Sequence, residues 1–213
     1  MSSQLSILQE VDQTIELDGK GSMIRYFPNY LDKSISDKYF SILLNEIEWD
    51  DTLRSSYGHT SKFNRKSSYY SQPGYPYPFS GRTFEGKAFT STMDEILKSL
   101  KQKYNYDFNS ILFNYYRDGK DTISWHTDNE KVLGQDPTVG TLSFGQERPF
   151  MLRERADHSV KREFISSHGS LIIMEGKTQN HWDHSVPQRM KLSNPRLSLT
   201  LRTIKIKGKD KDK

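Results

Sequence analysis

Two histidines and an aspartate stand at spacings that could build a metal site. His126 and Asp128 are separated by one residue, and a later motif contains both His181 and His184. Two imidazoles and one carboxylate on one face of an octahedral metal leave three positions open, which is the ligand set of non-heme Fe(II) oxygenases. In an extended segment His181 and His184 point to opposite faces, so only one of them can enter the site. An isolated His-x-Asp pair is more often ordinary surface or turn chemistry.

Residues 196–202 have a pattern that could serve such a metal. Leucines alternate with polar residues, which predicts a strand with leucine on one face. The iron would need a co-substrate that supplies electrons, and a dicarboxylate co-substrate would need a buried cation, for which guanidinium is suited. The alternative is a sheet with a solvated polar face. The residues on the polar face are Arg196, Ser198, Thr200 and Arg202.

A second strand is predicted at residues 110–116. Asn114 and Tyr116 lie two residues apart and therefore share a face. An amide and a phenol that point inward suit the remaining carboxylate oxygens of a small acid, whereas burial without partners would destabilise the fold. Alone, these two residues are equally typical of ordinary strand positions beside a turn.

The order and spacing of these motifs resemble the AlkB-type nucleic-acid demethylases, which are Fe(II)- and 2-oxoglutarate-dependent dioxygenases. The resemblance is closest to their eukaryotic DNA and RNA repair branch, and it runs from about Tyr57 to Thr203. The matching stretches are residues 64–66, 77–81, 114–119, 125–130, 143–145, 169–171, 181–187 and 194–202.

The resemblance implies a role for each matching residue. His126, Asp128 and His184 would bind iron, since the His-Ser-x-Pro match selects His184 and leaves His181 at the surface or behind the ligands. The residues implied around 2-oxoglutarate are Asn114, Tyr116, Arg196, Thr200 and Arg202.

The implied contacts to a target base are less uniform. Phe79 would stack on the base opposite the His126 ring, and Glu130 matches an acidic residue that helps to read the base edge. Asn129 stands where the family often has Asp. The full set is Tyr57, Gly58, His59, Arg65, Tyr77, Phe79, Asn129 and Glu130, of which the first three match a loop that inserts an aromatic ring into duplex nucleic acid.

Charge gives separate support for a nucleic-acid partner. The net charge is +4, but residues 205–213 carry five Lys and two Asp, so the rest is near neutral. Residues 54–87 hold six Lys or Arg against one acid and are rich in Tyr and Phe. Basic groups for phosphates with rings for bases are typical of nucleic-acid binding. The alternative is a pair of hairpins whose rings pack on the core.

We therefore expect oxidative demethylation of N-alkylated bases in DNA or RNA, as in repair of alkylation damage. The cofactors implied are Fe(II) and 2-oxoglutarate, and the methyl group would be hydroxylated and lost as formaldehyde. A 2-oxoglutarate oxygenase acting on protein or a small molecule would not need the basic, aromatic residues 54–87. A catalytically inactive nucleic-acid-binding module would lack a metal ligand, and none is lacking.

Helices precede strands along the chain, which indicates an α+β fold. We expect a helix from Ser36 as N-cap to about Ile47, with Ile35 and Phe40 as a hydrophobic staple, and a second from a Thr92–Glu95 capping box to Tyr104. Strands dominate from residue 110 onward. The resemblance implies a double-stranded β-helix, or jelly-roll barrel, with the N-terminal helices bracing one sheet.

The expected domain organisation is simple. Residues 22–205 form one dioxygenase domain between a flexible N-terminal arm, residues 1–21, and a Lys-rich tail, residues 206–213. The sequence has no bilayer-length apolar run, no signal peptide at residues 1–12 and no cysteine. We expect an intracellular monomer, nuclear or cytoplasmic, without a membrane partner.

Overall fold

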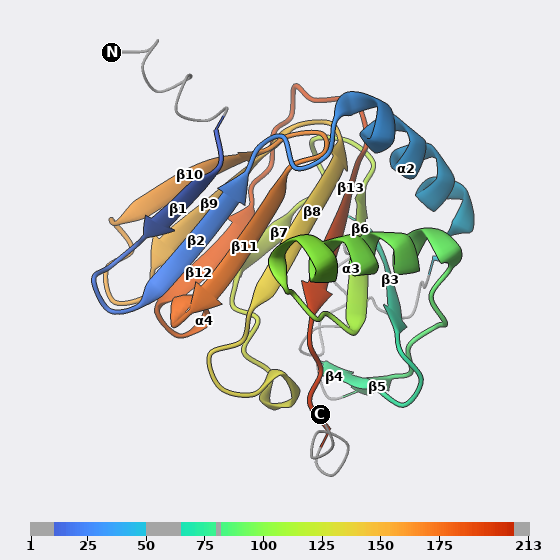
Figure 1. Ribbon diagram of the computed structural model, residues 1–213. Coiled ribbons are helices and arrows are strands. Elements are labelled where there is room, and N and C mark those ends of the chain that lie inside the picture. The colour runs from blue at the N-terminus through green and yellow to red at the C-terminus, as the bar shows by residue number, and fades with distance from the viewer. Residues whose placement is uncertain (1–10, 50–64, 80–81, 207–213) are drawn as a thin grey trace.

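Two facing β-sheets form the body of the protein. The computed structural model describes residues 11–49, 65–79 and 82–206 (Figure 1). Within them, the larger sheet has the order β1 (Gln13–Glu16), β2 (Ser22–Phe27), β11 (Leu171–Gly176), β8 (Val139–Gly145), β13 (Arg196–Arg202), β6 (Ser110–Tyr116) and β3 (Lys66–Ser71). The second sheet has the order β10 (Lys161–Ser166), β9 (Arg148–Glu154), β12 (Trp182–Val186) and β7 (Ile123–His126).

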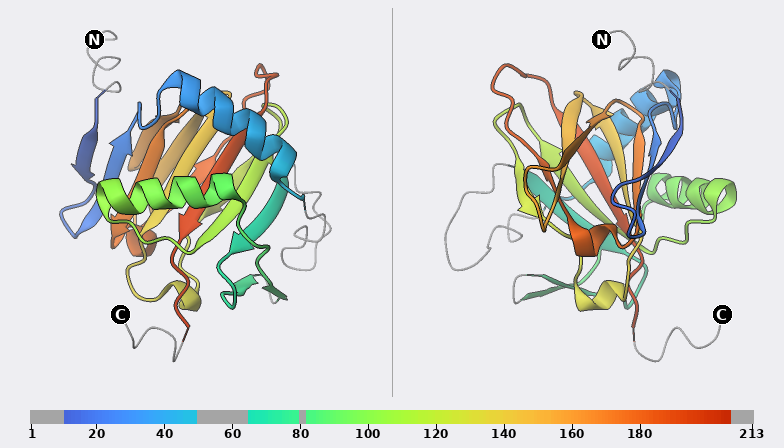
Figure 2. Two further views of the ribbon diagram at one scale, coloured as in Figure 1. Left: turned by 45° about the vertical axis from the view of Figure 1, so that its right-hand side comes forward. Right: turned by 90° about the vertical axis from the view of Figure 1, so that its left-hand side faces the viewer.

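The two sheets face each other (Figure 2), and a hydrophobic cluster fills the space between them. Neighbouring strands in both sheets run antiparallel, so alternate side chains of each strand point toward the opposite sheet. The cluster joins Ile172 and Met174 of β11 to Phe150 and Leu152 of β9. This arrangement gives the protein an interior that side chains of both sheets can reach.

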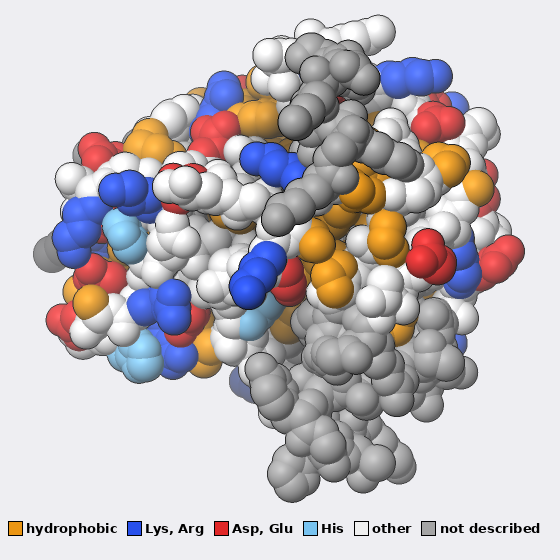
Figure 3. Space-filling view, turned by 90° about the horizontal axis from the view of Figure 1, so that it is seen from below, with side chains coloured by type: hydrophobic (Ala, Val, Ile, Leu, Met, Phe, Trp, Pro, Cys, Tyr) orange, Lys and Arg blue, Asp and Glu red, His pale blue; other side chains and the backbone are white. Residues whose placement is uncertain are grey.

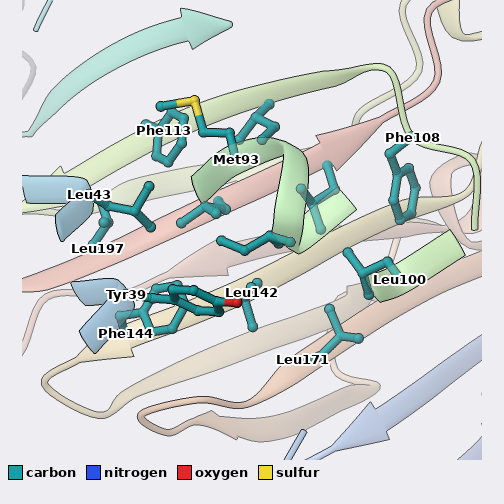
Figure 4. Close-up of a cluster of buried hydrophobic side chains, with 14 of the residues drawn as sticks. Tyr39, Leu43, Met93, Leu100, Phe108, Phe113, Leu142, Phe144, Leu171 and Leu197 are labelled. Carbon is teal, nitrogen blue, oxygen red and sulfur yellow. The ribbon is translucent and has the colours of Figure 1, made fainter. Parts of the chain in front are cut away.

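Two helices cover the outer face of the larger sheet. α2 (Lys33–Glu46) and α3 (Ser91–Tyr104) lie across it in Figure 1. Their buried residues join the leucines of β13 in one core cluster, part of which Figure 4 shows. As predicted, Leu197, Leu199 and Leu201 share this face. The polar side chains of β13 consequently point between the sheets.

The helix starts differ from the sequence prediction. Asp32, not Ser36, caps α2, and its carboxylate accepts the backbone N–H of Ile35. Thr90, not Thr92, caps α3 and accepts the N–H of Met93. In both regions Ser, Thr and Asp stand close together, and each can act as an N-cap. Ser36 is buried within α2, and the hydroxyls of both Thr90 and Thr92 donate to Glu46 of α2, so the residue types alone do not select the cap.

The predicted hydrophobic staple is also absent, since Ile35 is exposed within the first turn of α2. Tyr39, Leu43 and Ile47 are buried beneath α2, and Ile96 and Leu100 beneath α3.

Part of the expected N-terminal arm belongs to the folded domain. β1 pairs with β2 from Gln13 to Glu16, and Leu17 is buried in the cluster between the sheets. A short turn, Asp18 to Gly21, joins the two strands. Residues 13–16 therefore extend the larger sheet at its edge. No helix among the described residues is long and apolar enough to cross a membrane.

Candidate metal centre

The two strands that carry histidine ligands lie side by side in the smaller sheet. His126 ends β7, His184 lies in the middle of β12, and the two are direct partners across the strand pair. Asp128 follows β7 by two residues. One ligand atom from each of these three residues lies within 4.8 Å of the other two. This is the only such group with metal-binding geometry among the described residues.

Two hydrogen bonds fix Asp128. Arg202 of β13 donates to Oδ1 at 2.5 Å, and the backbone N–H of Asp128 donates to the side chain of Gln179 at 2.8 Å. Burial raises the pKa of Asp128, but attraction to Arg202 and the two imidazoles outweighs it and holds the pKa at about 2. Asp128 is therefore a carboxylate at neutral pH. Its Oδ2 is buried, accepts no hydrogen bond and lies 3.6 Å from His184 Nε2.

The histidines are in forms that can bind a metal. Nδ1 of His126 lies 2.8 Å from the carbonyl of Ser124 and must donate to it, so Nε2 is the ring nitrogen that is left to bind a metal. His184 is buried, and burial together with the nearby His126 lowers its pKa to about 3. It is therefore neutral at pH 7. The stacked Phe150 ring, 5.4 Å away, restricts the orientation of the His184 imidazole.

These donor atoms fit a divalent cation. A carboxylate oxygen and two imidazole nitrogens converge, and the carboxylate oxygen is buried without a hydrogen bond, which is costly unless a cation binds there. Three protein ligands would leave three positions of an octahedral metal for other groups, as a catalytic metal requires.

His181 lies outside this group. It ends the short helix α4 (Thr178–His181), and its Nδ1 contacts Asp18 Oδ2 at 3.0 Å. The side chain is about one-third exposed. The prediction that only one of the two histidines enters the site is confirmed, although His181 ends a helix and does not lie on an extended strand.

The two arginines of β13 differ in their partners. Both are buried, with 1% exposed area for Arg196 and 4% for Arg202. Arg196 donates to Ser143 at 2.8 Å, while its Nε and Nη1 are buried with no partner. Burial lowers the pKa of Arg196. Two unpaired N–H groups on one guanidinium suit a carboxylate, whereas the Nη2 of Arg202 is already bound to Asp128.

The polar face of β6 lies beside Arg196, as the sequence predicts. Tyr116 is its register partner, and the guanidinium lies 5.0 Å from the Tyr116 ring. Asn114 is buried, and its Oδ1 accepts from Arg65 Nε at 2.9 Å and from Ser67 at 3.0 Å. Arg65 thus orients Asn114. A second nitrogen of the Arg65 guanidinium, Nη1, donates to the carbonyl of Thr122.

Sequence reasoning did not identify Arg148 of β9. It is buried and donates to the carbonyls of Asp118, Asp121 and Pro187 at 2.8 to 3.1 Å. Its guanidinium also lies 5.6 Å from the Tyr116 ring. Arg148 therefore joins the loop after β6 to the end of β12 and adds a second positive charge near Tyr116.

Tyr77 and Glu130 lie beside the metal ligands. Arg202 stands 5.1 Å from the Tyr77 ring. Burial raises the pKa of Tyr77, Arg202 opposes this shift, and the carboxylates of Asp128 and Glu130 add to it. Glu130 Oε2 is buried, whereas Asn129 is exposed. Glu130 therefore places a carboxylate oxygen in the interior, whereas Asn129 faces solvent.

The basic, aromatic segment is only partly described. Tyr69, Tyr70 and Tyr77 are buried, so these rings pack on the core and present no free face to a base. Core packing therefore explains part of the aromatic content of residues 54–87. Tyr57, Gly58 and His59 lie outside the described residues, and Phe79 is described only through its backbone in β4 (Tyr77–Phe79).

A groove of about 440 Å³ lies on the lower face of the protein. Figure 3 shows this face, on which hydrophobic side chains gather. Pro78 and its partner Thr83 in β5 (Arg82–Phe84) line the groove and point away from Tyr77, because adjacent strand residues face opposite ways. The groove is therefore separate from the metal centre. Its other lining residues are Pro76, Lys131, Val132, Ile204, Lys205 and Ile206.

Comparisons with known proteins agree with this geometry. The family model of the 2OG-Fe(II) oxygenase superfamily matches residues 23–202. The Mus musculus alpha-ketoglutarate-dependent dioxygenase alkB homolog 3 is 34% identical over 192 residues, which cover 86% of this chain and 66% of that protein. The chain thus spans slightly less than two thirds of that relative's length.

Two further similarities concern a second relative and the fold. The Mus musculus DNA oxidative demethylase ALKBH2 is 32% identical over 183 residues, covering 81% of this chain and 76% of that protein. The solved structure of OsALKBH1 superposes with a TM-score of 0.59 at 15% identity, covering 90% of this chain and 99% of the other. At that identity the superposition supports the fold alone.

Proposed function

Because the chain belongs to the 2OG-Fe(II) oxygenase superfamily and, within it, to the AlkB-type dioxygenases, we propose that it oxidatively demethylates N-alkylated bases in DNA or RNA. Its relatives include a DNA oxidative demethylase. The corresponding role is repair of alkylation damage.

One observation carries the proposal. The His126–Asp128–His184 cluster and buried Arg196 border the same hydrophobic cluster between the sheets, because His184 stacks on Phe150, Arg196 lies over Tyr116, and both rings belong to that cluster. A metal at the first and a dicarboxylate held by the second are the two requirements of this chemistry. Asn114 and Tyr116 lie on the strand beside Arg196 and supply further polar groups for the acid.

The cofactors imply the overall reaction. Fe(II) and 2-oxoglutarate, when bound, would supply the oxidising power to put one oxygen atom of O2 into a C–H bond of the N-methyl group, with the other oxygen atom ending in succinate and CO2 released from 2-oxoglutarate. The resulting N-hydroxymethyl group then breaks its C–N bond, which releases formaldehyde and returns the proton to the base nitrogen.

The protein's own residues bind and orient the reactants. His126, Asp128 and His184 would hold the metal, with Arg202 and Gln179 fixing the carboxylate between them. Arg196 would bind the far carboxylate of 2-oxoglutarate through its free N–H groups. Glu130 would accept a hydrogen bond from an exocyclic amine of the target base. Phe79 would stack on that base.

We further propose that the two sheets form a double-stranded β-helix braced by α2 and α3, and that the strands from β1 to β13 belong to one catalytic domain. Their antiparallel strands around a shared interior support this fold. We propose that the protein acts as a monomer. Methylated DNA or RNA as substrate implies a nuclear or cytoplasmic location.

The proposal is tested by the dependence of 2-oxoglutarate turnover on nucleic acid. Succinate formation is measured with Fe(II) and matched oligonucleotides that differ only in one N-methyl group. We expect the methylated strands to stimulate turnover. Equal turnover with methylated and unmethylated strands, together with stimulation by a protein or small-molecule extract, would favour an oxygenase of another substrate class.

A further inference from the structure

Gln179 is buried in the middle of α4, with none of its surface exposed. A backbone N–H can only donate, so the bond from Asp128 identifies the facing atom as the carbonyl oxygen Oε1. The amide nitrogen then points the other way, 3.3 Å from Met174 Sδ. The amide therefore has one orientation that satisfies its neighbours.

Asp128 does not lie within a strand, so no ladder of backbone hydrogen bonds fixes it. It follows the end of β7, in a stretch without regular structure. Two side chains restrain it instead: Gln179 holds its backbone, and Arg202 holds one oxygen of its carboxylate. Together these contacts leave Oδ2 directed at His184.

The α4 turn is itself anchored to the N-terminal hairpin. The Thr178 hydroxyl accepts the N–H of Met23 at 2.9 Å and lies 2.6 Å from the carbonyl of Glu175. His181 contacts Asp18 at 3.0 Å. Figure 1 shows α4 at the lower end of the strands, beside β12. Contacts of Thr178 and His181, on either side of Gln179 in α4, therefore hold Gln179 in place.

We propose that Gln179 is a positioning residue for the metal centre, which sets the place of the ligand Asp128 through its backbone. This inference goes beyond the proposed function and depends only on the metal site, not on the nature of the substrate. Partners behind metal ligands typically change metal affinity by about 10–100-fold when they are removed. Gln179 should fall in this class although it touches no ligand atom.

The test is metal affinity of the purified protein without nucleic acid. Co(II) is titrated into the metal-free protein, and its visible absorption bands report binding. Gln179→Met keeps the length of the side chain but removes the carbonyl, and we expect its Kd for Co(II) to rise about 10-fold. Gln179→Asn keeps the amide but withdraws it from Asp128, and should behave in the same way.

Thr178→Val is the matched control. It removes hydrogen bonds from the adjacent buried residue of the same helix, without touching Asp128. We expect it to lower the Tm while leaving the Kd for Co(II) within about twofold of the wild type. An unchanged Kd in either folded Gln179 variant would overturn the proposal. So would an equal loss of affinity in Thr178→Val, because the effect would then reflect general loosening of α4.

These outcomes are distinguishable from failure of the proposed function. If the protein binds Co(II) through the three ligands but demethylates no oligonucleotide, the role of Gln179 is still measured. If Gln179→Met loses metal affinity while the substrate proves to be a protein, the inference stands and the substrate assignment falls.

Discussion

Arg202 and Asp128 form a buried ion pair at 2.5 Å, and this contact makes one of the two arginines of β13 a partner of the metal ligand. Burial lowers the pKa of Arg202, but the carboxylate of Asp128 outweighs this and raises it. The guanidinium is therefore always charged. Arg196, six residues earlier on the same face of β13, keeps two unpaired donors. The two arginines should consequently fail in different ways when they are mutated.

The first prediction distinguishes His184 of β12 from His181, which ends α4. His126→Ala, Asp128→Ala and His184→Ala should each abolish turnover, because losing one ligand removes the facial geometry. His181→Ala should keep turnover and lower only the Tm, since its partner is Asp18. Turnover and Tm are measured on all four variants. An inactive His181→Ala beside an active His184→Ala would show that the third ligand is misassigned.

The second prediction concerns Arg196. Arg196→Ala should weaken 2-oxoglutarate binding by about 2–5 kcal/mol, because it leaves a buried carboxylate without its partner. Arg196→Lys should restore little, since the bidentate fork is lost. Binding is measured by titrating 2-oxoglutarate into the metal-loaded variants. Nucleic-acid affinity should stay close to that of the wild type.

The control for this prediction is Arg202→Ala. It should weaken metal binding as well as 2-oxoglutarate binding, because it releases Oδ1 of Asp128. If Arg196→Ala bound 2-oxoglutarate with unchanged affinity, this residue would have no place in the co-substrate site.

The third prediction concerns pH and Asp18. Its buried carboxylate accepts hydrogen bonds from Ser22, Lys20 and Trp182. Burial raises the pKa of Asp18, but these bonds and His181 hold it well below its usual range. The stabilisation is therefore complete above the unfolded value of about 3.9 and is lost as pH falls toward the folded value.

Asp18→Asn tests this linkage. The free energy of unfolding is measured by urea denaturation between neutral pH and pH about 3. The variant should be less stable than the wild type at neutral pH, and the difference should shrink in acid. A constant difference across this range would contradict a depressed pKa for Asp18.

The sequence predicts the bounds of β13 and β6, the two strands of the proposed co-substrate site. The strict alternation of β13 also predicts which residues share a face, and its polar side proves to be interior. Helix starts were less predictable, because Asp32 and Ser36 are both competent caps and only packing distinguishes them.

The supporting residues of the site could not be predicted from the sequence. Gln179 lies 51 residues from Asp128, and Arg148 binds carbonyls up to 39 residues away. Neither contact leaves a periodic or local pattern in the sequence. The rings of Tyr69 and Tyr70 are buried, although they lie in a segment whose composition suggests nucleic-acid binding. A basic, aromatic composition does not distinguish rings that bind bases from rings that pack inside the protein.

A fourth prediction addresses strand preference. Tyr57→Ala should lower activity on duplex substrate more than on single strands, because only a duplex leaves a gap where a base has flipped out. Phe79→Ala should lower both, since stacking on a base contributes about 1–3 kcal/mol in either context. Equal losses on the two substrates for Tyr57→Ala would reject its role as a wedge.

The central claim is that the metal centre demethylates a base in nucleic acid. The most direct measurement is mass spectrometry of a panel of N-methylated DNA and RNA oligonucleotides, incubated with the protein, Fe(II), 2-oxoglutarate and O2. We predict products in which N–CH3 has become N–H, with formaldehyde formed in equal amount, and no product from His184→Ala. Unchanged oligonucleotides across the panel, with a protein that still converts 2-oxoglutarate to succinate, would contradict the account.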